Sequence, residues 1–279
     1  MKTSMIDTHC HLNFKRFKKT LEETITQATR AGVTTFIVPG TDAITSHKAV
    51  EIANTHEHAY AAVGFHPHHM FAMKQITSDI PEHITAQLTP LLAEKKVVAI
   101  GEVGLDRHLY EETKYPDYQV SEDFILDQQK ALITQIHLAI QYDKSLIIHN
   151  RETKKELLAI LTAEWDEKRR TKTVFHCCEP DRELLAFAKA HDIFIGIDGD
   201  VTYGGDKASF AQEIPLDMLV LETDSPFLLP EPLKSQRVYP NTPATIPTIA
   251  EAVANIKGVA VEEVAKQTTE NAQVLFSLS

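Results

Sequence analysis

The chain has 279 residues and a net charge of −11, and its 43% hydrophobic and 24% charged residues give an ordinary globular composition that excludes a disordered chain. The acidic balance argues against a protein that coats nucleic acid with its whole surface, because such affinity comes mainly from Lys and Arg. The three cysteines are too few for a disulfide framework, and no stretch approaches the roughly 18 apolar residues of a membrane span. We expect a cytoplasmic protein without a membrane partner or an obligate protein partner.

Eight short apolar runs follow one another along the chain, separated by amphipathic segments. The runs cover residues 5–9, 34–40, 59–67, 97–106, 145–151, 173–178, 193–199 and 219–226. Their near-continuous hydrophobicity is typical of parallel strands that are buried on both faces. Eight strand–helix units predict an α/β fold of the TIM (β/α)8 barrel type, which we expect to form one domain over residues 1–279.

The segments between and after these runs carry helix and loop signals. A helix is predicted over 21–32, where Gly32 stands at the expected C-cap, and a longer one over 124–142. The stretches 106–123 and 226–247 are rich in Pro, Tyr and charge, and long loops of this kind are commonly functional. Two closing helices, over 245–257 and 261–276, are expected to seal the outside of the barrel.

Most of the apolar runs end in a residue that binds metal or carries protons. These residues are His9, His11, His66, Glu102, His149, His176 and Asp224. Barrel active sites are built at that end, from strand ends and the loops that follow them. Residues two apart on a strand share a side, so His9 and His11 face together with Asp7 below them. Because buried charges are costly unless they are paired or bound to a metal, the set favours a metal site.

Each of these residues also has a simpler structural explanation. Roughly two in three chains with this many histidines contain a His-x-His by chance, and the spacing recurs here at His56/His58 and His66/His68. We expect His56 and His58 on the surface and Cys178 in the core. A glycine-rich phosphate loop and a Gly-x-Ser-x-Gly elbow are both absent from the sequence, which disfavours nucleoside-triphosphate and serine-hydrolase chemistry.

Eight motifs, in order and over almost the whole chain, resemble those of the TatD-type metal-dependent hydrolases. They are DTHCHL, GFHPH, GEVGLD, LIIHNRE, VFHCC, GIDGDVTY, LETDSPFL and ENAQVLF. The resemblance implies an amidohydrolase-like barrel with two divalent metal ions and a nuclease activity, often that of a DNA exonuclease. It also implies two ligand sets that share Glu102. The first is His9, His11, Glu102 and Asp224, and the second is Glu102, His149 and His176.

The implied reaction is hydrolysis of a phosphodiester by metal-activated water, for which Zn, Mg, Mn and Fe all suit the ligands. Asp224 is expected to act as general base and Glu102 to bridge the ions. Glu222 is expected either to orient a ligand histidine or to form a structural ion pair. His66 and Arg151 are expected to contact phosphate, since Arg donates two parallel hydrogen bonds. The substrate would be nucleic acid, such as DNA ends, or a small phosphodiester. A positive mouth is expected from Lys15, Arg16, Arg107, His108, Lys154, Lys155, Lys234 and Arg237.

Two motifs depart from the family pattern and leave the substrate open. Family members commonly carry HSRDA and HCFSGS where this chain has HNRET at 149–153 and HCCEP at 176–180. The ligands are retained, but Glu179 adds negative charge where a phosphate would approach. One alternative is therefore a metal-dependent amide or ester hydrolase, for example one acting on an aminoacyl-tRNA type of ester. Another is an inactive barrel that acts as a binding protein.

Overall fold

The computed structural model describes residues 4–113, 115 and 117–278. Its eight strands lie in one sheet in chain order, and every pair of neighbours is parallel. The strands are β1 (Met5–Asp7), β2 (Val33–Pro39), β3 (Ala59–Val63), β4 (Val97–Asp106), β5 (Ser145–Arg151), β6 (Thr173–Phe175), β7 (Phe194–Ile197) and β8 (Leu219–Leu221). β4 and β5 have the predicted bounds, β2 begins one residue before its predicted run, and the other strands lie within theirs.

The sheet closes between its first and last strands through the residues that follow them. The amide of Thr8 donates to the carbonyl of Leu221 over 3.1 Å, and the amide of Asp224 donates to the carbonyl of His9 over 2.9 Å. A further parallel bridge joins Cys10 to Ser225. The predicted (β/α)8 barrel is thus confirmed, and its seam brings two of the candidate ligand segments side by side.

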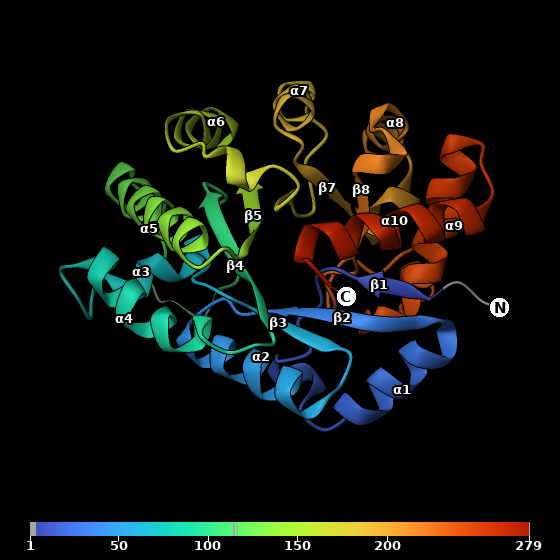
Figure 1. Ribbon diagram of the computed structural model, residues 1–279, viewed down its shortest axis with the longest axis horizontal. Coiled ribbons are helices and arrows are strands. Elements are labelled where there is room, and N and C mark those ends of the chain that lie inside the picture. The colour runs from blue at the N-terminus through green and yellow to red at the C-terminus, as the bar shows by residue number, and fades with distance from the viewer. Residues whose placement is uncertain (1–3, 114, 116, 279) are drawn as a thin grey trace.

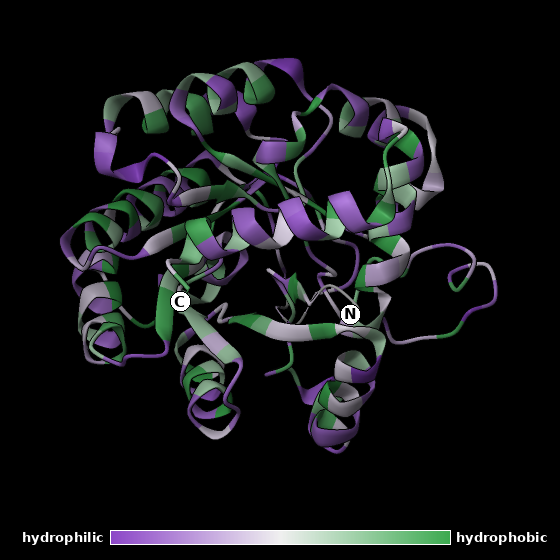
Figure 2. Cartoon of the chain, turned by 45° about the vertical axis from the view of Figure 1, so that its right-hand side comes forward, coloured by the Kyte–Doolittle hydropathy of each residue, from purple (hydrophilic) through white to green (hydrophobic). Residues whose placement is uncertain are grey.

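Helices surround the strands (Figure 1). They are α1 (Leu21–Ala31), α2 (Ala43–Thr55), α3 (Met70–Met73), α4 (Ile80–Leu92), α5 (Glu122–Gln141), α6 (Lys154–Ala163), α7 (Arg182–His191), α8 (Gly205–Glu213), α9 (Ile246–Lys257) and α10 (Val261–Phe276). Gly32 ends α1 with a φ of 101°, a left-handed conformation that favours glycine. Hydrophilic residues colour the outer turns of the helices, while the strands inside are mainly hydrophobic (Figure 2).

The last helix closes one end of the barrel, which corrects the expectation that it seals the outside. Ala272, Leu275 and Phe276 of α10 pack with one buried residue from every strand. Those eight residues are Ile6, Ile37, Ala62, Ala99, Ile147, Val174, Phe194 and Val220. Figure 1 shows α10 lying across the barrel. Ile147 shares a strand side with His149, and Val174 with His176, so this apolar layer lies directly below the candidate ligands.

Candidate metal centre

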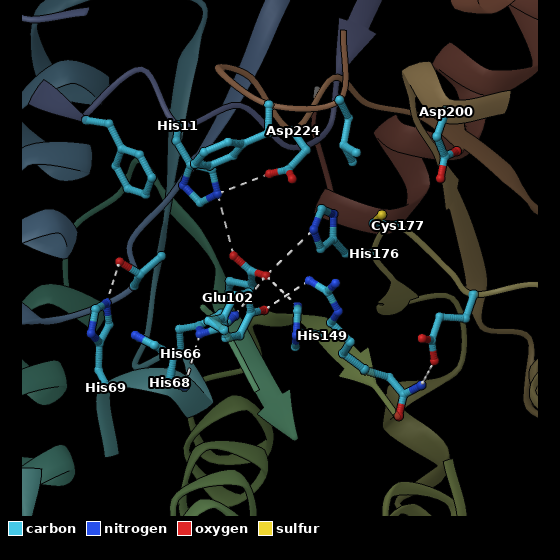
Figure 3. A pocket seen from close by; sticks show the side chains of 18 of the residues that line it. His11, His66, His68, His69, Glu102, His149, His176, Cys177, Asp200 and Asp224 are labelled. Atoms are coloured by element: carbon cyan, nitrogen blue, oxygen red, sulfur yellow. Dashed lines mark hydrogen bonds and ion pairs between the residues drawn. The ribbon is translucent and has the colours of Figure 1, made fainter. Parts of the chain in front are cut away.

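The six predicted ligands converge at the other end of the barrel, above the apolar layer. Figure 3 shows Glu102 in the middle, with His11 and Asp224 above it, His176 to its right, and His149 and His66 below it. The side chains are largely buried, and His9 is fully buried. Two groups among them, His9 with His11 and Glu102, and Glu102 with His149 and His176, each have donor atoms within 4.8 Å of one another, which is close enough to hold a metal ion. The structure therefore assembles the predicted set, while the role of each residue as a ligand stays a prediction.

The first set surrounds one point. The Nε2 atoms of His9 and His11 lie 3.2 Å apart, and each lies 3.5 Å from Oε2 of Glu102. Oδ1 of Asp224 lies 3.8 Å from His9 Nε2 and 3.3 Å from His11 Nε2. Donors about 2.0–2.1 Å from one tetrahedral ion lie about 3.3–3.4 Å apart. The donor spacing of this set therefore fits a single divalent ion.

The second set uses the other oxygen of Glu102. Its Oε1 lies 2.9 Å from Nδ1 of His149, 3.6 Å from Nε2 of His176 and 3.5 Å from Nε2 of His66. Glu102 thus divides its two oxygens between two groups of histidines, which is the arrangement expected of a bridging carboxylate. His66, which we predicted to contact phosphate, lies as near to Oε1 as His176 does, so it is placed to bind an ion as well.

Two buried carboxylates hold the rings of the second set. Nδ1 of His176 lies 2.9 Å from Oε1 of Glu222, so Nε2 is directed at Glu102. Nε2 of His149 lies 3.1 Å from Oδ2 of Asp106, so Nδ1 is directed at Glu102. A carboxylate on the far nitrogen fixes the tautomer of a ligand histidine and makes it more basic. The predicted positioning role of Glu222 agrees with this contact.

Local backbone features make room for this arrangement. The pairing of β4 with β5 is irregular between Ile100 and Val103, so the strand bends at Gly101 and Glu102. Gly196 of β7 lies against the carboxyl group of Glu222, where a Cβ atom would come within 2.4 Å of Oε1. Glycine at this position therefore lets Glu222 reach His176.

The electrostatics of the cluster favour a bound cation. Burial alone would raise the pKa of Glu102, but His66, His11 and His149 hold it well below its usual value of 4.5. Burial lowers the pKa of His11 and His149, but nearby carboxylates outweigh it and raise both to about 9. Without another cation the cluster therefore retains protons at neutral pH. A divalent ion would take their place, because ligand histidines must be neutral.

The centre opens into a pocket of about 680 Å³. Pockets of roughly 300–1,000 Å³ are typical of small-molecule sites. Its lining includes two basic side chains, those of Arg151 and Lys207. Lys207 is paired with Asp200 at 3.1 Å. In the described part of the chain no carboxylate pairs with Arg151, whose guanidinium donates to the Tyr110 hydroxyl over 3.2 Å. Arg151 is therefore placed to meet an anion, while its predicted contact with phosphate stays a prediction.

The predicted positive mouth is wrong in part. None of its eight residues lines the pocket, although Lys15 and Arg16 are exposed. Three of them are held by the acidic surface instead. Arg107 pairs with Glu122 and Glu156, His108 with Glu152, and Lys154 with Asp181 and Glu183. Because these side chains already pair with carboxylates of the protein, they are not free to bind a phosphate of the substrate. Of the other sequence candidates, His58 is exposed and Cys178 is buried, as expected, whereas His56 is half-buried beside Glu22.

Sequence reasoning missed several residues of the site. Asp106 is fully buried and also accepts from the Tyr110 hydroxyl over 2.7 Å. The sequence position of Asp106 could have indicated this role, because Asp106 follows Glu102 by four residues on the same strand and so points to the same side of the strand. Phe14 and Phe227 also line the pocket, and their sequence context gives no such signal.

Comparison with known proteins decides the family. The model of the family described as TatD related DNase matches residues 6–277. The chain belongs to this family. It is 34% identical, over 99% of this chain and 100% of the relative, to the uncharacterized metal-dependent hydrolase YabD of Bacillus subtilis. It is 32% identical, over 98% and 100%, to the 3'-5' ssDNA/RNA exonuclease TatD of Erwinia tasmaniensis.

The structure was also compared with solved structures. The crystal structure of YjjV, a TatD homolog from Escherichia coli K12, superimposes with a TM-score of 0.84 at 27% identity, over 100% of both chains. The chain is thus a metal-dependent hydrolase of the TatD family, and the buried cluster of histidines and carboxylates is its candidate metal centre. In the described part of the chain, no helix is both long and apolar enough to span a membrane.

Proposed function

We propose that this protein is a 3'–5' exonuclease that cleaves phosphodiester bonds in single-stranded DNA or RNA with two divalent ions. The observation that carries the proposal is Glu102, whose two oxygens face two separate groups of donors. Arg151 lines the same pocket, and no carboxylate of the described residues pairs with it. The exonuclease name of the Erwinia relative supports the substrate class. When bound, two ions of this kind activate water and polarise a phosphoryl oxygen. Zn, Mn, Fe and Mg are the candidate ions for these ligands.

The residues of the chain supply proton transfer and positioning. Asp224 has a side chain only 16% exposed, and His11 and His176 outweigh burial and hold its pKa below 3.8. Its carboxylate is thus ionised at neutral pH, and we assign it the role of accepting a proton from the attacking water. The same group would return that proton to the leaving oxygen.

Arg151 follows the ligand His149 by two residues on β5 and so faces the same side of the strand. Tyr110 holds the guanidinium by a hydrogen bond and by its ring, whose centroid lies 5.1 Å from Cζ. A planar guanidinium donates two parallel hydrogen bonds to phosphate. We assign Arg151 the task of orienting the scissile phosphate.

The test is cleavage of single-stranded DNA and RNA labelled at the 5' end, by metal-stripped protein with each divalent ion restored. We expect stepwise shortening from the 3' end that requires metal and is lost in the His9→Ala/Asp224→Ala variant, which controls for contaminating nucleases. Arg151→Ala should lower kcat/KM by at least tenfold while metal content is unchanged. Metal binding without cleavage of either nucleic acid would overturn the proposal and direct the search to amides and other esters.

A further inference from the structure

An aromatic corner lies next to the metal centre and has no part in the chemistry described above. Phe14, from the loop after β1, and Phe227, from the loop after β8, both line the pocket together with Leu228. The ring of Phe14 stacks on that of His11 with centroids 4.2 Å apart and planes at 17°. Phe227 meets Phe14 edge to face, at 6.3 Å and 74°. The corner therefore begins at a candidate ligand and extends outward.

Phe227 presents an open aromatic face at this corner. The residue is 52% exposed, although it lines a pocket in which the neighbouring ligand His11 is almost fully buried. Phe14 is only partly buried and supports Phe227 from one side. The two rings are nearly perpendicular, so a flat ligand would stack on the open face of Phe227 rather than slide between them.

The backbone holds Phe227 in a fixed position. Its amide donates to the carbonyl of Asp224 over 2.9 Å, which ties the aromatic ring to a candidate ligand. The fully buried Asn241 donates from its side chain to the carbonyls of Thr223 and Leu228, at 3.0 and 3.3 Å. These bonds flank Phe227 on both sides. The backbone that carries the ring is thus held before a ligand binds, which lowers the entropy lost on binding.

We propose that Phe227 is a stacking platform for one nucleobase next to the scissile phosphate, with Phe14 as its support. This inference rests on the proposed function and names what the pocket recognises besides phosphate. Arg151 meets the charged backbone, whereas an uncharged aromatic face suits the flat surface of a base. Stacking of this kind tolerates every base, so we expect cleavage with little sequence preference.

The test combines removal of the aromatic ring with removal of the base. Wild type and Phe227→Ala are compared on a 5'-labelled single strand and on the same strand with an abasic residue at the last or the next-to-last position of the 3' end. Stacking contributes about 1–3 kcal/mol per base, which is a change of about 5- to 150-fold. We expect Phe227→Ala to raise KM by a factor in this range on the normal strand, with kcat nearly unchanged. At one of the two abasic positions it should cause no further loss.

Three controls separate stacking from damage to the centre. Phe227→Trp should restore the KM of the wild type, because it restores an aromatic face. Tyr239→Ala removes a 58% exposed ring of the same loop that does not line the pocket, and it should behave as wild type. Metal content and melting temperature of Phe227→Ala should equal those of wild type.

The outcomes distinguish this inference from the proposed function. If wild type cleaves the normal strand but Phe227→Ala loses equally on the normal and both abasic strands, the platform is wrong and the exonuclease assignment stands. The platform is also wrong if Phe227→Ala cleaves all strands like wild type. If wild type cleaves none of the strands in the presence of bound metal, both proposals fall together.

Discussion

At the scale of single residues, the contact between Glu222 and His176 shows how a buried carboxylate prepares a ligand. The ring nitrogen Nδ1 lies 2.9 Å from Oε1 of Glu222, and the amide of Cys177 donates to the same oxygen over 2.6 Å. Because this carboxylate fixes the tautomer and raises the basicity of the ring, Glu222→Gln should weaken metal binding by about 10- to 100-fold. Calorimetric titration of the metal-stripped protein measures the change.

A matched control for this variant is Glu213→Gln, since Glu213 pairs with Arg182 at 2.6 Å on the surface. It removes the same charge and should leave metal affinity unchanged. Equal affinities for wild type and Glu222→Gln would show that Glu222 is a structural ion pair rather than a positioning residue.

Asp200 gives a prediction about pH. Burial and the neighbouring Asp198 raise the pKa of Asp200 from 3.8 to about 8, against the opposing effect of Lys207. Folding therefore favours the protonated carboxyl. The resulting stability is complete below pH 4 and is lost as the pH rises through 8. Asp200→Asn mimics the protonated form, so it should match wild type only below about pH 4, and its advantage should grow with pH to at least about 2 °C in Tm at pH 9.

Thermal unfolding of both proteins across this pH range, in the presence of a chelator, measures the difference. The exposed Asp206, next to Lys207 in sequence, supplies the control, and Asp206→Asn should follow the wild-type profile. A wild-type Tm that equals or exceeds that of Asp200→Asn at pH 9 would contradict the assigned direction.

At the scale of elements, the sequence predicted the bounds of the strands and of the closing helices, but not where α10 packs. Continuous apolar runs identify strands buried on both faces, and β4 and β5 match their predicted ranges. The path of α10 has no local signal, because an apolar helix face is the same whether it packs beside a barrel or across its end. Only the eight-strand layer that receives Leu275 and Phe276 distinguishes the two.

In the candidate site, the residues at strand ends could also be predicted from the sequence, whereas the residues on loops could not. The six ligands stand at strand ends, where period-two alternation and the known face of barrel active sites bring them together. Residues on long loops have no such rule, so the pairing of Arg107 with Glu122 and the placement of Phe227 could not be predicted. The local sequence pattern therefore predicts the ligands of the metal centre, whereas the residues around it depend on loop conformations that the pattern does not predict.

Because Ala272, Leu275 and Phe276 of α10 form a plug at the end of the barrel away from the metal centre, we predict that stability and catalysis can be changed separately. Phe276 is 2% exposed within the apolar layer. Phe276→Ala should therefore lower the free energy of unfolding by about 3–5 kcal/mol. Because the plug lies below the centre, the folded variant should cleave substrate like wild type. Denaturant titration and initial rates measure both.

Val274 lies on the same helix but is 53% exposed, so Val274→Ala should change stability by less than about 0.5 kcal/mol. A Phe276→Ala variant that remains as stable as Val274→Ala would show that α10 does not close the barrel as described. Loss of cleavage at unchanged stability would contradict the separation between the two ends.

At the scale of the whole molecule, the barrel places its two ends in contrasting environments. One end is apolar and closed by α10, while the other gathers histidines and carboxylates beneath a pocket that contains Arg151. The net charge of −11 and the paired surface cations make the rest of the molecule a poor ligand for nucleic acid. Substrate recognition should therefore depend on the pocket, which suits the cleavage of chain ends.

The most direct test of the account is a titration of metal-stripped protein with one divalent ion, in which bound metal per chain and cleavage of a single-stranded oligonucleotide are measured on the same samples. We predict no cleavage without metal, a rise with occupancy, and saturation near two ions per chain. The His9→Ala/Asp224→Ala variant should bind fewer ions and remain inactive. Full cleavage by wild-type protein that holds less than about a tenth of an ion per chain would contradict the central claim that this cluster is a metal centre that performs hydrolysis.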